Sequence, residues 1–257
     1  MIFDTHAHYD DLQFDTDRKE LLAAMSEHGV GTIVNASATV ESWQRVLELT
    51  EEYPFIYGML GVHPDEVGAL TEERLLEMEM LLKREKIVAV GEIGLDYYWD
   101  NESHNVQKKW FIRQLELAKK AGLPVNIHSR EAAADTMDIL KQYGQGMKAI
   151  IHCYSYSKEM AEEYVRMGYL IEIGGVVTFK IARKLKEVVQ AIPISNIVME
   201  TDCPYLAPEP NRGKRNSSAN LRYVAEAIAE LKGMTAEEVI QKTTENASGF
   251  YGIAEAR

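Results

Sequence analysis

Short runs of apolar and β-branched residues alternate along the chain with longer segments whose apolar positions recur at helical spacing. The short runs predict buried strands, because a strand that is covered on both faces reads as a continuous apolar stretch. The runs are IFDTH at 2–6, GTIVNAS at 31–37, FIYGMLGVH at 55–63, IVAVGEIG at 87–94, PVNIHS at 124–129, KAIIHC at 148–153, YLIEIGG at 169–175 and NIVMETD at 196–202.

The longer segments predict helices, and several carry recognisable start or stop residues. Glycine just beyond a helix favours its termination, and a threonine side chain can cap the first turn. The clearest helices are expected at 18–29 with a stop at Gly29, at 71–86 with Thr71 as the cap but without a full capping box, at 106–122 with a stop at Gly122, and as two helices from about 219 onward with Thr235 as a cap.

Eight strands that are each followed by a helix, in a chain of 257 residues, predict an α/β fold of the (β/α)8 TIM-barrel type, with residues 1–257 forming a single domain. The alternative is an open, doubly wound sheet. A glycine-rich phosphate loop after the first strand would favour the open sheet. The residues there are HAHYDD at 6–11, so the barrel is favoured.

The overall composition narrows the class of protein. The hydrophobic fraction of 46% and the charged fraction of 26% are those of an ordinary globular protein. A formal charge of −12 argues against broad non-specific binding to nucleic acid or anionic membranes, although bound divalent cations would change the local potential. Two cysteines make no disulfide framework, and neither a signal peptide nor a membrane-length apolar run is visible. These features predict a cytoplasmic protein without a membrane partner.

Histidines concentrate at the predicted strand ends, which is where the chemistry of a (β/α)8 barrel takes place. Of the seven histidines, only His28 and His104 fall in or beside predicted helices. The strand-end residues are His6 and His8 on the first strand, His63 on the third, Glu92 on the fourth, His128 on the fifth, His152 on the sixth and Asp202 on the eighth.

Imidazole and carboxylate ligands suit zinc, manganese and related divalent ions. Four histidines and two carboxylates are more than one tetrahedral ion needs, and they suit two ions that share a bridging carboxylate. Such a pair of ions activates water for hydrolysis. The candidate metal ligands are His6, His8, Glu92, His128, His152 and Asp202.

Structural alternatives stay open for several of these residues. His63 precedes Pro64 and could belong to a turn or to the core, Glu92 could be a paired core carboxylate, and Asp202 could cap a loop. Cys153 and Cys203 each follow a candidate ligand and are interpreted as small buried thiols.

Several short motifs, in this order and spacing, resemble the TatD family of metal-dependent deoxyribonucleases within the amidohydrolase superfamily. The resemblance covers nearly the whole chain. The motifs are DTHAH at 4–8, GVHP at 61–64, GEIGLDYY at 91–98, LPVNIHSR at 123–130, HCYS at 152–155, ETDCPYLAP at 200–208 and GKRN at 213–216.

The resemblance implies a role for each strand-end residue. His6 and His8 would hold one metal ion, and His128 and His152 the other. Glu92 would bridge the two ions. Asp202 would bind the first ion, orient the attacking water and accept its proton. His63 would lie near the scissile phosphate or the attacking water rather than on the ions. The cofactors would be two divalent ions, such as Zn²⁺, Mg²⁺ or Mn²⁺.

The implied reaction is hydrolysis of a phosphodiester, with DNA as the substrate, single-stranded or at a chain end. Hydrolysis of an ester such as D-aminoacyl-tRNA, a small-molecule amidohydrolase activity, and a metal-binding protein with an idle site are the alternatives. The sequence is compatible with a monomer. Relatives commonly carry proline soon after the Arg-Asn pair, whereas here Arg215-Asn216 is followed by Ser217-Ser218.

Basic and aromatic residues near the strand ends are candidates for binding this substrate. Arg130 follows the fifth strand, and Lys214 and Arg215 follow the eighth, so these three are the predicted phosphate binders. A solvated loop is the alternative for Lys214 and Arg215. The aromatic residues at 97–99, which follow the fourth strand, could stack on a base or pack beneath a loop.

Overall fold

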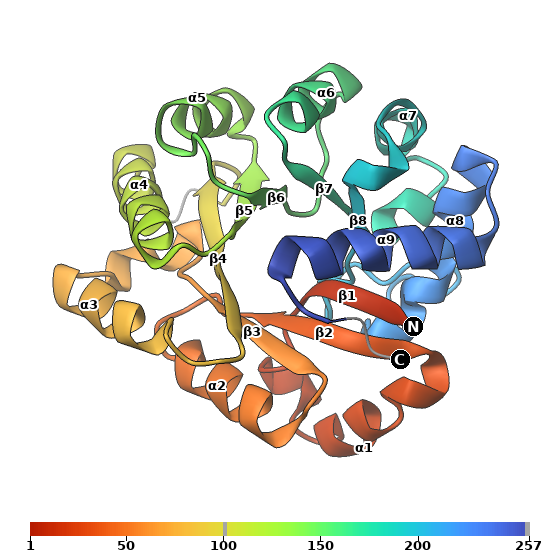
Figure 1. Ribbon diagram of the computed structural model, residues 1–257, viewed down its shortest axis with the longest axis horizontal. Coiled ribbons are helices and arrows are strands. Elements are labelled where there is room, and N and C mark those ends of the chain that lie inside the picture. Colours follow the sequence, from red (N-terminus) through yellow and green to blue (C-terminus); the bar gives the residue numbers. More distant parts are fainter. Residues whose placement is uncertain (100–101, 255–257) are drawn as a thin grey trace. The chain divides into compact units, whose positions relative to one another are not determined.

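The computed structural model describes residues 1–99 and 102–254, and eight parallel strands run through them in the order β1 to β8 (Figure 1). Each strand is followed by a helix, so the (β/α)8 prediction is confirmed and the strand order of a doubly wound sheet is not found. The strands are β1 (Ile2–Ala7), β2 (Val30–Ala36), β3 (Ile56–Leu60), β4 (Ile87–Asp96), β5 (Val125–Arg130), β6 (Ala149–Ile151), β7 (Leu170–Ile173) and β8 (Ile197–Met199).

The helices predicted at 106–122 and from about 219 onward begin and end close to the expected residues. The segment predicted at 18–29 instead forms α1 (Arg18–Ala23) and a separate 3-10 helix (Met25–His28), and the helix predicted at 71–86 already ends at Leu81. Gly29 adopts the left-handed conformation just beyond the 3-10 helix, and Gly122 does so just beyond α4 (His104–Ala121). The Thr71 hydroxyl accepts a hydrogen bond from the Arg74 backbone N–H. The helices are α1 (Arg18–Ala23), α2 (Ser42–Glu52), α3 (Glu72–Leu81), α4 (His104–Ala121), α5 (Ala133–Tyr143), α6 (Lys158–Arg166), α7 (Arg183–Ala191), α8 (Leu221–Lys232) and α9 (Ala236–Tyr251). In the described part of the chain, no helix has the length and apolar character needed to span a membrane.

Contacts within the chain divide it into two compact units. The terminal unit comprises Met1–Asn35 and Cys153–Arg257 and holds β1, β7, β8 and nearly all of β2. The central unit comprises Ala36–His152 and holds β3 to β6. The expectation of a single domain stays a prediction.

In the terminal unit, β1 pairs with β2 and reaches the segment after β8 through a bridge between Ala7 and Cys203. The last helix, α9, lies along β1 and β8 (Figure 1). The Tyr251 ring stacks on Phe3 at 5.9 Å, and its hydroxyl donates to the backbone oxygen of Thr5 at 3.3 Å. The C-terminal helix therefore supports the strand that carries the first two candidate ligands.

In the central unit, β4 is buried along its whole length and pairs with β3 and β5. Gly94 lies opposite His128 in the register of β4 and β5 and has φ of 152°. A Cβ atom at Gly94 would meet the backbone oxygen of His128 at 1.9 Å. Glycine is therefore required where β4 approaches the backbone of a candidate metal ligand.

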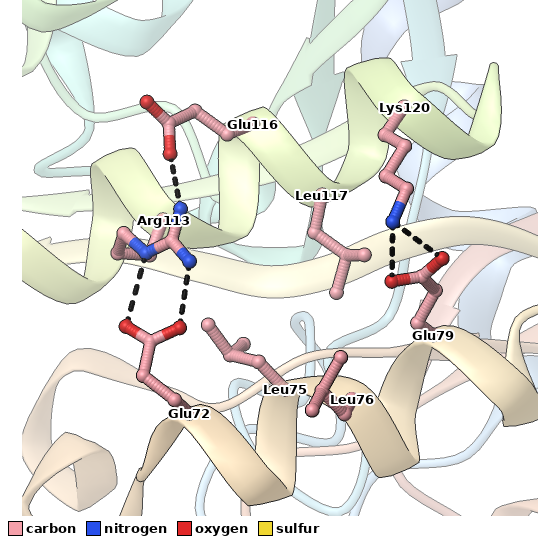
Figure 2. Close-up of a pocket in the computed structure, with 8 residues that line it drawn as sticks. All are labelled: Glu72, Leu75, Leu76, Glu79, Arg113, Glu116, Leu117 and Lys120. Atoms are coloured by element: carbon pink, nitrogen blue, oxygen red, sulfur yellow. Dashed lines mark hydrogen bonds and ion pairs between the residues drawn. The ribbon is translucent and has the colours of Figure 1, made fainter.

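A groove with an apolar floor runs between α3 and α4 on the helical side of the central unit (Figure 2). Leu75, Leu76 and Leu117 line it. Its rim carries ion pairs from Arg113 to Glu72 at 2.6 Å and from Lys120 to Glu79 at 2.7 Å. Exposed pairs of this kind contribute little stability each, and the groove is lined by no histidine, so the candidate chemistry lies elsewhere.

Candidate metal centre

The terminal unit gathers three predicted ligands at the end of β1 and after β8. The Nε2 atoms of His6 and His8 lie 3.0 Å apart, and Oδ1 of Asp202 lies 3.4 Å from Nε2 of His8 and 4.0 Å from Nε2 of His6. One possible ligand atom from each residue falls within 4.8 Å of the others. His6 and His8 are buried, and Asp202 is partly exposed, so this cluster has the donor set and burial of a metal site.

Asp4 holds the segment after β8 against β1. Its carboxylate accepts hydrogen bonds from the backbone N–H of Thr201 at 3.0 Å, the Thr201 hydroxyl at 2.6 Å and the Ser218 hydroxyl at 2.6 Å. Burial raises the pKa of Asp4 to about 7, although these hydrogen bonds act in the opposite direction. Asp202, which follows Thr201, has φ of 54° and donates its N–H to the backbone oxygen of His6 at 3.0 Å. These bonds fix Asp202 beside the two histidines.

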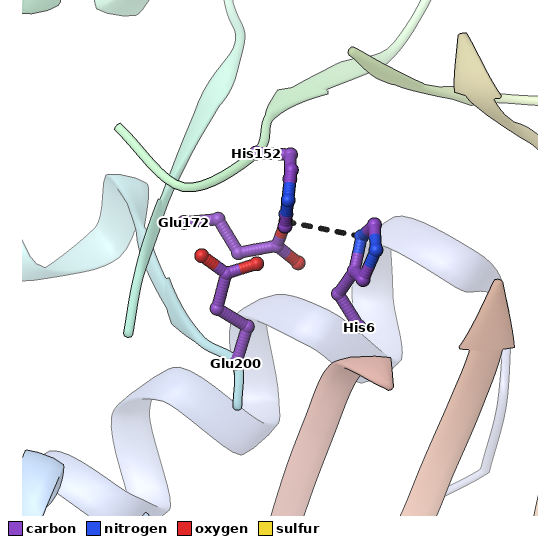
Figure 3. A group of neighbouring side chains, drawn as sticks. All are labelled: His6, His152, Glu172 and Glu200. Atoms are coloured by element: carbon purple, nitrogen blue, oxygen red, sulfur yellow. Dashed lines mark ion pairs between the residues drawn. The ribbon is translucent and has the colours of Figure 1, made fainter. Parts of the chain in front are cut away.

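Two buried glutamates lie close to His6, and the sequence analysis did not identify them. Glu172 on β7 has its Oε2 atom 3.9 Å from Nδ1 of His6 (Figure 3). It also accepts a hydrogen bond from the Thr5 hydroxyl. Glu200, which follows β8, accepts the backbone N–H of Cys153 at 2.9 Å. Both are fully buried. A glutamate inside an otherwise apolar strand, as in LIEI at 170–173, was the available signal.

In the central unit, Glu92 is the common partner of three histidines. Its Oε1 atom lies 2.7 Å from Nδ1 of His128, 3.5 Å from Nε2 of His152 and 3.8 Å from Nε2 of His63. His63, Glu92 and His128 can each offer a ligand atom within 4.8 Å of the others. The bridging role of Glu92 stays a prediction.

The prediction that Glu92 ends the fourth strand is wrong. The strand β4 continues to Asp96, because its pairing with β5 goes on through Leu95 with Ser129 and Asp96 with Arg130. His152 directly follows β6, whereas His63 and Asp202 each lie three residues beyond their strands. The active-site side of the strands is therefore built partly by strand interiors and partly by the loops that follow.

His63 serves the turn after β3 as well as the cluster. Its Nδ1 atom accepts the backbone N–H of Asp65 at 3.3 Å at the start of the short helix Pro64–Ala69. Its ring lies edge-on to His128, with 4.3 Å between the ring centroids. His63 therefore both begins the turn before Pro64 and lies within the candidate metal centre.

Asp65 and Asp96 were not identified from the sequence, although they fall among groups with metal-binding geometry together with His63. Burial, together with the negative charge of Asp96, raises the pKa of Asp65 to about 6. Burial alone would also raise the pKa of Asp96, but hydrogen bonds from His128 and from the backbone N–H groups of Trp99 and Tyr98 bring it below its ordinary value. Asp96 is thus held as an anion at the end of β4.

His128 has a carboxylate at each ring nitrogen. Glu92 lies at Nδ1, and Oδ2 of Asp96 lies 3.0 Å from Nε2. Burial lowers the pKa of His128, but the hydrogen bonds to Asp96 and Glu92 outweigh burial and raise it to about 9. A divalent cation at this position must therefore displace a proton.

The predicted phosphate binder Arg130 is exposed at the end of β5. Its guanidinium carbon lies 3.8 Å from the centroid of the Tyr98 ring and 5.6 Å from that of Trp99. Tyr97 differs from its two neighbours, because its ring stacks on His104 at 3.5 Å and its hydroxyl donates to Asp135 at 2.6 Å. The three aromatic residues thus divide into one that packs and two that are exposed.

Lys214 and Arg215 belong to the loop after β8 in the terminal unit. Lys214 is exposed, and its Nζ atom lies 3.5 Å from Oδ1 of Asn211. Arg215 forms a bidentate ion pair with Asp17 and lies over the Phe14 ring at 4.8 Å. The solvated-loop alternative therefore describes Lys214 better than Arg215. Phosphate binding by either residue stays a prediction.

The loop in which Ser217-Ser218 departs from the family pattern, directly after Arg215-Asn216, supports the site. The Asn216 side chain donates to the backbone oxygen of Thr201 at 2.9 Å, and the Ser218 hydroxyl donates to Asp4. Both residues are buried. This loop therefore stabilises the position of Asp202 by hydrogen bonds in place of a proline.

The two cysteines differ in their surroundings. Cys203 is fully buried, and burial raises the pKa of its thiol. Cys153 is only partly buried and has φ of 42°. The interpretation as a small buried thiol therefore fits Cys203 better than Cys153.

Known proteins resemble this chain over nearly its whole length. A model of the TatD related DNase family matches residues 3–252. The chain belongs to the TatD family. The metal-dependent hydrolase YabD of Bacillus subtilis (strain 168) is 45% identical over 254 residues, which cover 98% of this chain and 100% of that protein.

Two further relatives of this TatD-family chain are similar over nearly their full lengths. The human deoxyribonuclease TATDN3 is 32% identical over 263 residues, which cover 97% of this chain and 94% of that protein. The crystal structure of YjjV, a TatD homologue from Escherichia coli K12, superimposes with a TM-score of 0.92 at 32% identity and covers 98% of each chain. The (β/α)8 fold is therefore that of the family.

Proposed function

We propose that this metal-dependent hydrolase of the TatD family is a deoxyribonuclease that hydrolyses phosphodiester bonds at a DNA end. The observation that carries the proposal is a pair of His/carboxylate clusters built by the predicted residues, one around His6, His8 and Asp202 and one around Glu92. The family description as a related DNase and the human relative named as a deoxyribonuclease support DNA as the substrate.

We assign both clusters to one dinuclear site, because chemistry in (β/α)8 barrels takes place at the C-terminal ends of the strands. His6 and His8 would hold one divalent ion together with Asp202, and His128 and His152 the other, with Glu92 between them. The donor set of imidazoles and carboxylates fits Zn²⁺, Mn²⁺ and, through the carboxylates, Mg²⁺. When bound, such ions lower the pKa of a water and neutralise charge that develops on the phosphate.

The chain's own residues would position the reactants and move the proton. Asp202 would accept the proton of the attacking water, since its carboxylate is partly exposed and lies 3.4 Å from His8. His63 would stand beside the scissile phosphate. Its Nδ1 already accepts the N–H of Asp65, so Nε2 is the atom that would face the phosphate.

A protein with a net charge of −12 can bind the end of a DNA chain with few positively charged residues, because few phosphates need to be neutralised there. Arg130 would bind the phosphate next to the scissile bond. Lys214 would contribute a second positive charge, and Arg215 would do so to the extent that it exchanges Asp17 for phosphate.

The test is to incubate metal-loaded protein with end-labelled single-stranded DNA, with an aminoacyl-tRNA ester and with a panel of lactones. We expect hydrolysis of the DNA with stepwise release of nucleotides. Hydrolysis of the tRNA ester or a lactone, with DNA left intact, would contradict the proposal and would favour one of the other two enzyme classes.

The role of Asp202 has a matched control in the same experiment. Asp202→Asn should lower kcat on DNA by about 10²- to 10⁴-fold, the usual contribution of a positioned general base. Asp138→Asn, an exposed aspartate on α5, should leave kcat unchanged. The metal content of both variants is measured in parallel, so that loss of an ion is distinguished from loss of the base. Full activity in Asp202→Asn would refute the assigned role.

A further inference from the structure

Two aromatic side chains and a guanidinium group form an exposed surface where β4 and β5 end. The Tyr98 and Trp99 side chains are 50% and 59% exposed, and their rings meet edge to face at 5.0 Å between centroids. The Arg130 guanidinium lies over the Tyr98 ring at 3.8 Å. We name Tyr98, Trp99 and Arg130 the aromatic platform.

The platform is tied to the candidate metal centre by one carboxylate. Oδ1 of Asp96 accepts the backbone N–H of Tyr98 at 2.8 Å and that of Trp99 at 3.1 Å. Oδ2 of the same Asp96 lies 3.0 Å from Nε2 of His128. The backbone N–H of Tyr97 donates to the backbone oxygen of Arg130 at 2.9 Å. The position of the platform relative to His128 is therefore set by short hydrogen bonds.

Packing beneath a loop does not account for this surface. The neighbouring Tyr97 uses both its ring and its hydroxyl in contacts with His104 and Asp135. The other two tryptophans of the chain, Trp43 and Trp110, are only 2% and 6% exposed. Tyr98 and Trp99 thus expose two adjoining aromatic rings beside the candidate metal centre, and a contiguous exposed apolar surface is a candidate binding surface.

We propose that the aromatic platform binds the terminal base of a DNA substrate by stacking, while Arg130 contacts the adjacent phosphate; this inference rests on the proposed nuclease function. Every base has a flat face that can stack on an aromatic ring, and an unpaired terminal nucleotide presents this face without a neighbouring base or a pairing partner in the way. The planar guanidinium of Arg130, oriented by Tyr98, has the fork of N–H donors that phosphate oxygens accept.

The first test uses the fluorescence of Trp99, which is the exposed one of three tryptophans. Metal-loaded Asp202→Asn protein is titrated with single-stranded oligothymidylate, and binding is followed independently by the anisotropy of a labelled oligonucleotide. We expect quenching of the tryptophan emission that saturates together with the anisotropy. The quenching should disappear when Trp99→Phe is added to the same protein. Saturating binding without quenching would overturn the inference.

The second test measures whether a base is needed. Wild-type protein should hydrolyse an oligonucleotide with a terminal base about 5- to 150-fold more efficiently, in kcat/KM, than one with an abasic terminal residue, which is the range expected for one base stacked on an aromatic side chain. Most of the difference should lie in KM. In Trp99→Leu the ratio should fall toward one, whereas Trp99→Phe should keep much of it. Met80→Ala, an exposed apolar change on α3, should keep the wild-type ratio.

The outcomes separate this inference from the proposed function. Hydrolysis of DNA with equal efficiency on both substrates, or an unchanged ratio in Trp99→Leu, would refute the platform while the nuclease function stands. Quenching of Trp99 by DNA without hydrolysis by the wild-type protein would refute the nuclease function while the platform stands. Neither quenching nor hydrolysis would refute both.

Discussion

The imidazole of His128 lies where either a proton or a divalent metal ion can bind. Glu92 and Asp96 approach its two ring nitrogens at 2.7 Å and 3.0 Å, respectively. The same carboxylates that would attract a divalent ion also favour the protonated imidazole. A metal ion and a proton therefore compete for His128.

This competition predicts that divalent ions bind more tightly as the pH rises toward 9. Because the pKa of His128 is about 9 in the metal-free protein, affinity should increase by up to roughly tenfold per pH unit below that value, for one proton displaced. Calorimetric titrations with Zn²⁺ or Mn²⁺ in two buffers of different ionisation enthalpy measure the released proton. An affinity independent of pH between 6.5 and 9 would contradict the prediction.

The raised pKa of His128 also makes the stability of the metal-free protein depend on pH. The pKa of His128 is raised from 6.5 to about 9, so the stabilisation is fully present below pH 6.5 and is lost as the pH rises through 9. The melting temperature of the metal-free protein should therefore fall across this window through His128. His128→Gln should remove that part of the decline, whereas His28→Gln, at an exposed histidine, should not.

The ends of helices in this chain can be predicted from neighbouring residues more readily than the geometry of the site. The helix α9 has a full capping box, since the Thr235 hydroxyl accepts the Glu238 N–H and the Glu238 carboxylate accepts the Thr235 N–H. The helix α3 has only the first half of this arrangement, through Thr71. Because caps are short-range, Thr235 and Thr71 could both be predicted as caps from the sequence, whereas the return bond from Glu238 was not predicted.

Thr235→Ala should destabilise the protein by about 1 kcal/mol, because it leaves N-terminal backbone groups of α9 without their partner. In a chain of this size the melting temperature should drop by about 2–4 °C. Urea denaturation at unchanged m-value measures the effect, and Thr71→Ala on α3 is the comparison, with a similar or smaller loss. An unchanged midpoint for Thr235→Ala would show that packing of α9 on β1 and β8 is sufficient without the cap.

Strand length was the part that local rules predicted least well. The apolar run of the fourth strand was expected to end near Gly94, but β4 continues through Leu95 to Asp96. The extension exists because β5 continues beside it to Arg130, which is a partner 34 residues away in the register Asp96–Arg130. Pairing with a distant strand therefore placed Asp96 within reach of His128.

Among residues 1–99 and 102–254, each compact unit brings predicted ligands close together. His6, His8 and Asp202 come from segments at the two ends of the terminal unit. In the central unit, Glu92 lies on β4 and His128 on β5, and His152 directly follows β6. Ions bound to either cluster would therefore connect segments that are far apart in sequence and would stabilise the folded chain.

Addition of Zn²⁺ or Mn²⁺ at about 100 times the dissociation constant should stabilise the protein by about 2.7 kcal/mol per site, which corresponds to a rise of about 5–10 °C in melting temperature. A chelator should reverse this rise in melting temperature. With two ions bound, His8→Ala and His128→Ala should each retain part of the rise, and ion content should fall from two per chain. Loss of the whole rise in both variants would indicate a single ion, and no rise in wild type would contradict metal binding.

The sequence by itself determined the fold class and the identity of most candidate ligands. Alternation of apolar runs with amphipathic segments depends on burial along each strand or helix, so it is written in neighbouring residues. The histidines were recognisable because five of seven stood beside apolar runs, where a soluble helix surface would not place them. Glu172 and Glu200 were missed, because a single carboxylate in or after an apolar run does not reveal which distant residues it will meet.

Only the tertiary structure decided which atoms meet. That one oxygen of Glu92 faces His63, His128 and His152 depends on the register of β3 to β6 and on the loops between them. That Tyr97 packs while Tyr98 and Trp99 remain exposed depends on His104 and Asp135, which belong to other helices. Distances between residues remote in the chain are set by packing as a whole, and no local pattern encodes them.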